Sequence, residues 1–282
     1  MTEIFDPSEL KKLYKPAHDS GGEDNGQVTI IGGSELFHGA PLLSLKVASR
    51  LVDMVFFATP EKSVGTIAER LKSKLLSFIW VPWDEVEDYV AKSDAVLIGP
   101  GFMRFRSEKV PQERRESGFD NTAKVSREIT QRLLGKFPDK RWVIDAGALQ
   151  VMDADWIPKG AIVTPNNKEF NFLFGDIQAF EVAKKYDCIV VTKGAEAKVC
   201  SSERCVEIKN GNPGLTTGGS GDTLAGSAVG LLAKNDPFLA AASAIYVTKA
   251  AADGLYKKVG TNFNADDLAD QVPVVLGRSL DI

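Results

Sequence analysis

The sequence has few residues of the kinds that bind zinc or cross-link small domains. Its 282 residues include 3 cysteines and 2 histidines. The cysteines, at positions 188, 200 and 205, form no C-x-x-C pair, and His18 and His38 show no metal-ligand spacing. These shortages exclude a disulfide framework and a histidine- or cysteine-based metal site. They favour reduced thiols in a cytoplasmic protein.

Long apolar runs and an excess of positive charge are also missing. The longest uncharged apolar stretch, residues 237–248, is too short to span a bilayer. The N-terminus shows no basic segment followed by an apolar one, so no signal peptide is visible. The formal net charge of -4 gives no general reason to expect nucleic-acid binding. We therefore expect a cytoplasmic protein whose partners include neither membranes nor nucleic acids.

A repeated order of strand and then helix is the main pattern that is present. Apolar runs predict strands at residues 27–31, 54–58, 76–81, 95–98, 142–144, 161–164 and 188–192. Helical patterns lie between them at residues 39–51, 63–75, 84–91 and 121–134, and a short helix follows residue 144. This alternation is typical of an α/β fold with a mostly parallel central sheet and helices on both faces.

The C-terminal part of the chain departs from this alternation. Residues 199–200 and 205–208 predict a small antiparallel hairpin at one side of the sheet. After the hairpin every pattern is helical, at residues 222–233, 237–258 and 264–277.

No change in composition marks a domain boundary, so we predict a single domain over residues 1–282. Residues 1–26 form a polar N-terminal extension, and residues 103–124 form a charged insertion. The insertion is too polar for the core. It is either a solvated loop or a flap that contacts ligand phosphates.

The glycine-rich stretch 211–222, GNPGLTTGGSGD, is the strongest functional signal. It leads directly into a predicted helix, whose N-terminus presents unpaired amides and a partial positive charge. Glycines let a phosphate approach the backbone closely, so this stretch predicts an anion site. Asp222 falls in the first turn. There it is either a functional carboxylate beside bound phosphates or only a charge that stabilises the helix end.

Other short motifs follow the predicted strands, at the sheet edge where open parallel sheets bind ligands. They are Gly32-Gly33-Ser34, Gly99-Pro100-Gly101, Asp145-Ala146-Gly147, residues 164–169 (TPNNKE) and Lys193-Gly194-Ala195. None of them is a dinucleotide fingerprint, and the chain has no G-x-x-x-x-G-K-[ST] loop. The phosphates are therefore held in another way.

In this order the motifs resemble the ADP- or ATP-dependent NAD(P)H-hydrate dehydratases, which have a ribokinase-like fold. The resemblance covers residues 28 to 276 and includes NADDL at 264–268. Its most specific parts are Gly32-Gly33-Ser34, Gly39-Ala40-Pro41, Ile98-Gly99-Pro100-Gly101, Lys193-Gly194 and the glycine-rich stretch 211–222.

The resemblance implies a set of site residues. Expected nucleotide contacts are Lys193, Gly194, Ala195, Glu196, Ala197, Gly219, Ser220 and Gly221. Expected contacts to the hydrated NADH or NADPH are Ala40, Gly101, Asn166 and Asp222, with Asp222 as the catalytic base. ADP or ATP would be the co-substrate, and Glu169 would act on Mg²⁺ through water. We also expect a homo-oligomer.

Three positions depart from the family pattern. Asn166 stands where the family usually has histidine, Gly147 where it commonly has a second aspartate, and His18-Asp19-Ser20 where it has His-Lys-Gly. Asn166-x-x-Glu169 resembles instead the motif by which related kinases organise magnesium. Asn166 could also simply close a turn after proline, and Lys193 could be a surface lysine at a strand end.

The implied reaction repairs NADH or NADPH that has added water to its nicotinamide ring. The nucleotide phosphorylates the ring hydroxyl, Asp222 with an ordinary pKa of about 3.9 accepts the proton, and phosphate then leaves. One alternative is a ribokinase-like kinase that releases a stable phosphate ester from a sugar or vitamin. Another is a nucleotide-binding protein without turnover.

Overall fold

The computed structural model describes residues 3–72, 74–105 and 123–280. Most of the predicted charged insertion, residues 106–122, lies outside the described residues. The described strands are β1 (Glu3–Ile4), β2 (Gln27–Ile31), β3 (Met54–Ala58), β4 (Ile79–Val81), β5 (Ala95–Ile98), β6 (Arg141–Ile144), β7 (Ile162–Val163), β8 (Ile189–Thr192), β9 (Ala197–Cys200) and β10 (Cys205–Ile208).

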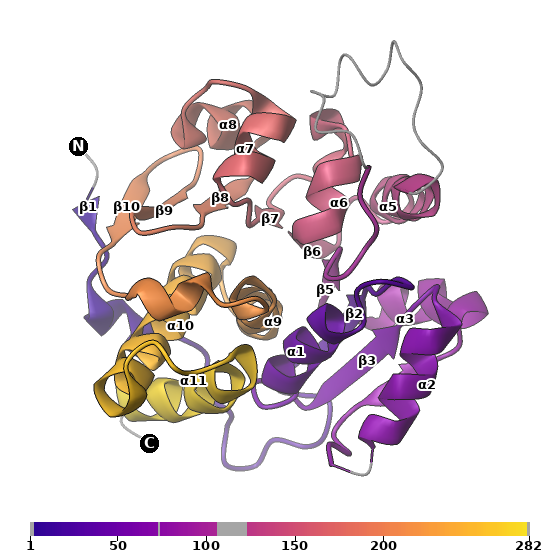
Figure 1. Ribbon diagram of the computed structural model, residues 1–282, viewed down its shortest axis with the longest axis horizontal. Coiled ribbons are helices and arrows are strands. Elements are labelled where there is room, and N and C mark those ends of the chain that lie inside the picture. The colour runs from indigo at the N-terminus through magenta and orange to yellow at the C-terminus, as the bar shows by residue number, and fades with distance from the viewer. Residues whose placement is uncertain (1–2, 73, 106–122, 281–282) are drawn as a thin grey trace.

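These strands form one sheet in the order β1-β10-β9-β8-β7-β6-β5-β2-β3-β4 (Figure 1). All neighbours pair in parallel except at β9, which is antiparallel to both β8 and β10. The mostly parallel sheet and the antiparallel hairpin at one side are therefore confirmed. The strands predicted at 27–31, 54–58 and 95–98 have the predicted ends.

The described α-helices are α1 (Gly39–Ala48), α2 (Lys62–Leu71), α3 (Val86–Lys92), α5 (Lys124–Lys136), α6 (Ala146–Val151), α7 (Asn167–Phe174), α8 (Ala179–Tyr186), α9 (Ser220–Leu232), α10 (Pro237–Val259) and α11 (Ala265–Ser279). The sequence patterns did not predict α7 and α8, which join β7 to β8. Each has 8 residues, a length at which helical periodicity is weak.

Two hydrophobic cores lie on opposite faces of the sheet. In β5, Ala95 and Leu97 belong to one core, and Val96 and Ile98 belong to the other, because successive side chains of a strand point to opposite faces. Helices α1, α2, α9, α10 and α11 cover the first face, and α3 and α5–α8 cover the second (Figure 1). The prediction of helices on both faces is confirmed.

The expectation of reduced thiols is wrong for two of the three cysteines. Cys200 and Cys205 form a disulfide across the hairpin. Their antiparallel register places them directly opposite each other at the end of β9 and the start of β10. One pair of facing cysteines is enough for such a bridge, so the bridge does not depend on further disulfides. Cys188 is free and buried, and burial raises the pKa of its thiol to about 12.

The N-terminal segment contributes to the core, which its polar composition did not predict. β1 extends the sheet by pairing with β10, and the 3-10 helix η1 (Pro7–Lys12) follows it. Phe5, Leu10 and Leu13 are buried against the α9–α11 side of the sheet. Within residues 1–26, these three apolar side chains therefore pack into the core, and the polar residues belong to the loop that follows them.

The longest of the described helices, α10, has 23 residues and is interrupted by charged side chains. Within the described ranges, no helix combines the length and the apolar character needed to cross a membrane.

Candidate active site

The direction of the strand order reverses between β2 and β5. From β2 the chain adds β3 and β4 on one side, and from β5 it adds β6, β7 and β8 on the other. Ligands of open α/β sheets bind in the crevice outside the carboxyl ends of the strands at such a point. The glycine motifs after the two strands meet there, because the Gly33 N–H donates to Pro100 O at 2.8 Å. Gly101, a predicted substrate contact, is buried next to this contact.

Two helix N-termini point to the same edge of the sheet. Helices α1 and α9 lie side by side (Figure 1), with Ser44 Oγ donating to Asp222 O at 2.8 Å. Their backbones are in close contact, because a Cβ on Gly226 would lie 2.4 Å from Ser44 O. The predicted substrate residue Ala40, in the first turn of α1, is thereby brought to the same end as the first turn of α9.

The glycine-rich stretch shapes the start of α9. Gly219 is the N-cap residue with a φ of 93°, in the left-handed region that favours glycine. The Ser220 hydroxyl donates to Leu215 O at 2.7 Å and the Ser220 N–H donates to Thr217 O at 3.4 Å, so this residue fixes the loop at the start of the helix. Gly221 and Asp222 follow in the first helical turn and are half-buried. The predicted anion site thus lies at the N-terminus of α9.

Lys193 connects the strand ends to this helix terminus. Its Nζ donates to Asp145 Oδ1 at 2.6 Å, and a Cβ on Gly221 would lie 3.4 Å from the same Nζ. Thr164 Oγ1 donates to Asp145 Oδ1 at 2.7 Å. The side chain of Lys193 is 18 % exposed and that of Asp145 is 1 % exposed. The alternative that Lys193 is merely a surface lysine is therefore wrong.

Glu169 completes the charged cluster around Lys193. Its Oε2 lies 4.0 Å from Lys193 Nζ and accepts from the Asn166 N–H at 2.9 Å, and its Oε1 accepts from Gln150 Nε2 at 3.0 Å. Burial raises the pKa of Glu169, and the nearby Asp145 adds to this effect, whereas Lys193 opposes it. For Lys193, burial disfavours the charge, but Asp145 and Glu169 outweigh it and raise the pKa.

The expected ordinary pKa of Asp222 is wrong. The pKa of this carboxyl is raised to about 7. Burial is the largest cause, and the charges of Asp145 and Glu169 also raise the pKa, whereas Lys193 lowers it. Asp222 is therefore close to half-protonated at neutral pH. A general base works best when its pKa lies near the working pH, so the raised value suits proton transfer.

The loop after β8 carries the other predicted nucleotide contacts. Gly194, Ala195 and Glu196 are exposed, whereas Ala197 is buried as the first residue of β9. The Lys193 N–H donates to Pro165 O at 3.1 Å, which ties the start of the loop to the segment after β7. Three of the predicted contacts are thus open to a ligand beside the cluster.

Asn166 has a structural role in addition to any role in binding. Its Oδ1 accepts from the Glu169 N–H at 3.0 Å, and the two residues form a capping box at the start of α7. The Asn166 residue is exposed, and none of the described residues accepts a hydrogen bond from its Nδ2. The motif that resembled the kinase signature is therefore also a helix cap.

The structure explains why glycine occupies position 147. A Cβ at Gly147 would lie 2.4 Å from Phe102 O and 2.7 Å from Phe102 Cβ. An aspartate, common in the family at this position, would require the segment after β5 to move. Glycine at position 147 therefore leaves room for the buried Phe102 of this chain.

Two members of the cluster were not predicted as site residues. Asp145 is among the motifs at the strand ends, but its contact with Lys193 depends on the ends of β6 and β8 coming together. Gln150 lies on α6, and only the fold shows that it reaches Glu169. The position of Asp145 directly after a buried strand was the available signal.

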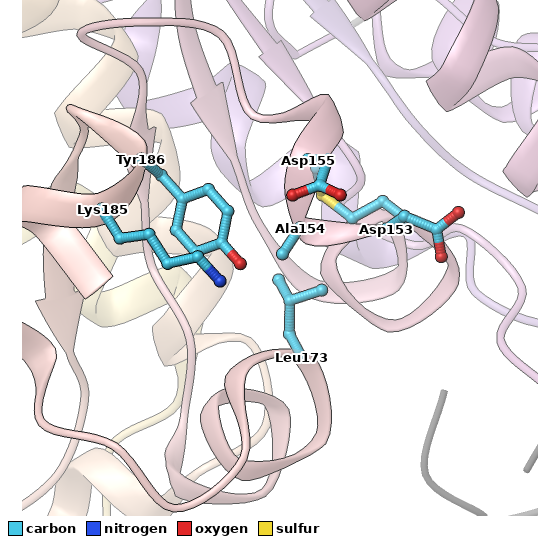
Figure 2. A pocket seen from close by; sticks show the side chains of 7 residues that line it. Asp153, Ala154, Asp155, Leu173, Lys185 and Tyr186 are labelled. Atoms are coloured by element: carbon cyan, nitrogen blue, oxygen red, sulfur yellow. The ribbon is translucent and has the colours of Figure 1, made fainter. Parts of the chain in front are cut away.

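A separate cavity of about 210 Å³ lies between the segment after α6 and helices α7 and α8. Figure 2 shows Lys185 and Tyr186 on one side of it and Asp153, Ala154 and Asp155 on the other. None of the predicted site residues lines this cavity, so it is distinct from the cluster around Asp222.

Within the described ranges, no three His, Cys, Asp or Glu side chains are grouped so as to hold a metal ion. Asp145 and Glu169 share the Lys193 ammonium instead. This arrangement fits Mg²⁺ only in the form in which nucleotides usually carry it, bound to phosphates and water with few protein ligands.

Comparison with known proteins agrees with this geometry. A bifunctional NAD(P)H-hydrate repair enzyme of Methanocaldococcus jannaschii is 31 % identical over 276 residues, which cover 95 % of this chain and 51 % of the relative. The ADP-dependent (S)-NAD(P)H-hydrate dehydratase of Cenarchaeum symbiosum is 29 % identical and is covered over 91 % of its length. The chain thus spans about half the length of the bifunctional relatives that it matches.

Solved structures show the same fold. A ribokinase-like superfamily protein of Enterococcus faecalis superimposes with a TM-score of 0.80 at 21 % identity, covering 100 % of this chain and 97 % of the other. An ADP/ATP-dependent NAD(P)H-hydrate dehydratase of Bacillus subtilis, co-crystallized with ATP/Mg²⁺, gives 0.76 at 21 % identity and covers 99 % of both chains. The fold is therefore ribokinase-like. Since the family model of the NAD(P)H-hydrate dehydratases also matches residues 28–274, this chain belongs to the NAD(P)H-hydrate dehydratase family.

Proposed function

We propose that this chain uses ADP or ATP to dehydrate hydrated NADH or NADPH. One observation carries the proposal: the half-buried carboxyl of Asp222 stands in the first turn of α9, where the Lys193 ammonium reaches the adjacent Gly221. A base beside an anion-binding helix terminus supplies two of the parts needed to transfer a phosphoryl group to a hydroxyl.

In the proposed first step, the hydroxyl on the nicotinamide ring attacks the terminal phosphorus of the nucleotide. Asp222 accepts the hydroxyl proton, and the bond between this phosphorus and the bridging oxygen breaks, which leaves AMP from ADP or ADP from ATP. The amides of Gly219 and Gly221 and the Lys193 ammonium would stabilise the negative charge on the transferring group. Mg²⁺, when bound to the nucleotide, would neutralise further phosphate charge.

In the second step, the carbon–oxygen bond to the new phosphate group breaks. The electron pair of the ring nitrogen forms the double bond, phosphate leaves with the bonding pair, and a ring proton is lost to solvent. The nicotinamide is thereby restored to NADH or NADPH. Phosphate is a far better leaving group than hydroxide, and this difference is the reason for consuming a nucleotide.

The substrate would bind in the crevice between α1 and the loops after β2 and β5, near Ala40 and Gly101, with Asn166 at the opposite side. The nucleotide would lie along the loop from Lys193 to Ala197. Glu169 would contact Mg²⁺ only through water, since both of its oxygens already accept hydrogen bonds.

The test is incubation of the protein with hydrated NADH, Mg²⁺ and either ADP or ATP. We expect NADH and inorganic phosphate to appear in equal amounts with at least one nucleotide. Untouched hydrate, together with phosphorylation of a sugar or vitamin alcohol, would identify a kinase. Nucleotide binding with no turnover of any of these compounds would identify a binding protein.

We also propose that the chain forms a homo-oligomer. β1 is an edge strand of the sheet and carries Ile4, which is 62 % exposed, so this edge is available for contact with a second copy. Light scattering on the purified protein tests this, and a mass equal to one chain would refute it.

A further inference from the structure

A lysine without a predicted role is buried in the middle of α10. Lys249 is 5 % exposed, and its Nζ donates to Ile208 O at 3.1 Å, Ala195 O at 3.3 Å and Gly194 O at 3.5 Å. An ammonium group has three N–H donors, so all three are used on backbone carbonyls. Burying a charged group is costly unless it has such partners.

These carbonyls belong to two neighbouring segments, since Ile208 pairs with Ala197 at the start of β9, directly after the loop that holds Gly194 and Ala195. Gly194 and Ala195 lie in the exposed loop after β8, and Ile208 ends β10. Lys249 therefore joins helix α10 to the loop in which the nucleotide contacts are expected. The same helix also holds the glycine-rich stretch, because Asp253 accepts from the Gly211 N–H at 2.9 Å and from Asn212 Nδ2 at 2.8 Å.

Space for the lysine depends on a glycine. A Cβ on Gly211 would lie 2.4 Å from Lys249 Cε, and Gly211 has a φ of 107°. A larger residue at this position would displace the lysine side chain. The glycine-rich stretch is thus adapted to Lys249 as well as to α9.

The direction of the carbonyls determines the direction of the amides. In a trans peptide the N–H points opposite to the C=O of the same unit. Because Lys249 draws the carbonyls of Gly194 and Ala195 toward α10, the N–H groups of Ala195 and Glu196 point away from α10. None of the described residues accepts a hydrogen bond from these two amides.

We propose that Lys249 is a positioning residue for the nucleotide: it fixes the loop after β8 so that the Ala195 and Glu196 amides are presented to the nucleotide phosphates. This inference rests on the proposed nucleotide-dependent function. It extends that function to a residue that does not itself touch the ligand.

The test is Lys249→Met, which keeps much of the side-chain length and removes the three donors. Its matched control is Lys257→Met on the exposed surface of the same helix. ADP and ATP binding are measured by calorimetry without hydrate, followed by the kinetic constants. We expect the Kd and KM for nucleotide to rise about tenfold, as for one lost hydrogen bond to a charged group. The KM for hydrate and kcat should stay near those of the parent.

A second variant covers the case in which Lys249→Met does not fold. Gly211→Ala keeps the charge but pushes the lysine aside and also strains the backbone at this position, and it should weaken nucleotide binding as well. Unchanged nucleotide affinity in the folded variants, or an equal loss of kcat and hydrate affinity, would overturn the role of Lys249. If the parent binds ADP or ATP but leaves hydrate untouched, only the proposed function fails. If the parent binds neither nucleotide, both proposals fail.

Discussion

The ammonium of Lys193 lies 2.6 Å from the Asp145 carboxylate, although β8 and β6, which they follow, are not neighbours in the sheet. β7 lies between them and is followed by Thr164, whose hydroxyl donates to the same carboxylate oxygen. Three strand ends are therefore joined through one buried oxygen atom. The charge state of Asp222 depends on this arrangement, because both partners of the ion pair act on its pKa.

Asp222→Asn should reduce hydrate turnover by about 10²–10⁴, since the amide cannot accept the hydroxyl proton. Nucleotide affinity should be kept or increased, because a carboxylate near the phosphates is removed. The control is Asp88→Asn, which removes an exposed carboxylate from the first turn of α3. Turnover by the Asp222 variant close to that of the parent would show that the residue serves only the helix end.

The same variant should be at least as stable as the parent at alkaline pH. The folded-state pKa of Asp222, about 7, lies above its ordinary value of 3.8, so folding favours the protonated form. The stability contributed by this protonation is present below the unfolded pKa and is lost as the pH rises through about 7. We expect the melting temperature of Asp222→Asn, relative to the parent, to increase between about pH 5 and pH 8.5. A constant difference would contradict the raised pKa.

The pH dependence of the parent enzyme tests the same carboxyl kinetically. The value of kcat/KM for hydrate should rise with pH and reach half of its maximum near pH 7, as the free Asp222 deprotonates. An aspartate with an ordinary pKa would give a flat profile in this range. A flat profile from about pH 5.5 to 8 would therefore argue against Asp222 as the base.

Asp145→Asn should move that midpoint to lower pH. The Asp145 charge is one cause of the raised pKa of Asp222, and removing it also leaves the Lys193 ammonium less neutralised. Both effects favour the ionised form of Asp222. Thr164→Val, which removes only the hydroxyl that donates to Asp145, serves as the control and should leave the Asp145 charge in place. An unchanged midpoint in Asp145→Asn would show that the two carboxylates do not interact.

Asn166→Ala should cost about 0.5–2 kcal/mol of stability, because it removes the cap of α7. The chain offers a matched control in Asn264, which makes the same capping box with Asp267 at the start of α11. If Asn166 also contacts substrate, its variant should lose catalytic efficiency while Asn264→Ala loses only stability. Equal kinetics in the two variants would assign Asn166 to the cap alone.

Reduction of the Cys200–Cys205 disulfide should lower stability by about 2 kcal/mol, because the bridge closes a short loop in the unfolded chain. Thermal unfolding with and without a reductant measures this difference. A variant with both cysteines changed to serine should melt independently of the reductant. A parent that also melts independently of the reductant would contain no such bridge in solution.

The sequence patterns predicted the central strands more accurately than the short elements. Runs such as residues 95–98 are buried on both faces, so their composition alone separates them from helices. β1 has only 2 residues and its pairing depends on β10, which lies about 200 positions away along the chain. Helix α7 begins at Asn166-x-x-Glu169, and this motif was interpreted through its chemistry and not as a helix start.

The composition of the site was predicted in part, and its electrostatics were not. Asp222 and Lys193 follow from local motifs, because glycine-rich loops and strand ends are recognisable along the chain. The pKa of Asp222 depends on its burial and on charges contributed by Asp145 and Glu169, which come from other strands and helices. Likewise, the disulfide follows from the register of β9 and β10 and not from the spacing of the cysteines.

The contact between Gly226 and Ser44 sets the distance between helices α1 and α9 at the site. Helix α1 carries the proposed hydrate side and α9 the nucleotide side, and their separation is set where no Cβ intervenes. Even an alanine at position 226 would act as a spacer and move the base away from the hydroxyl that it must deprotonate. Proton transfer requires hydrogen-bond distance, so such a variant would lose catalysis, and because the added Cβ meets backbone atoms of Ser44 it would also lose stability.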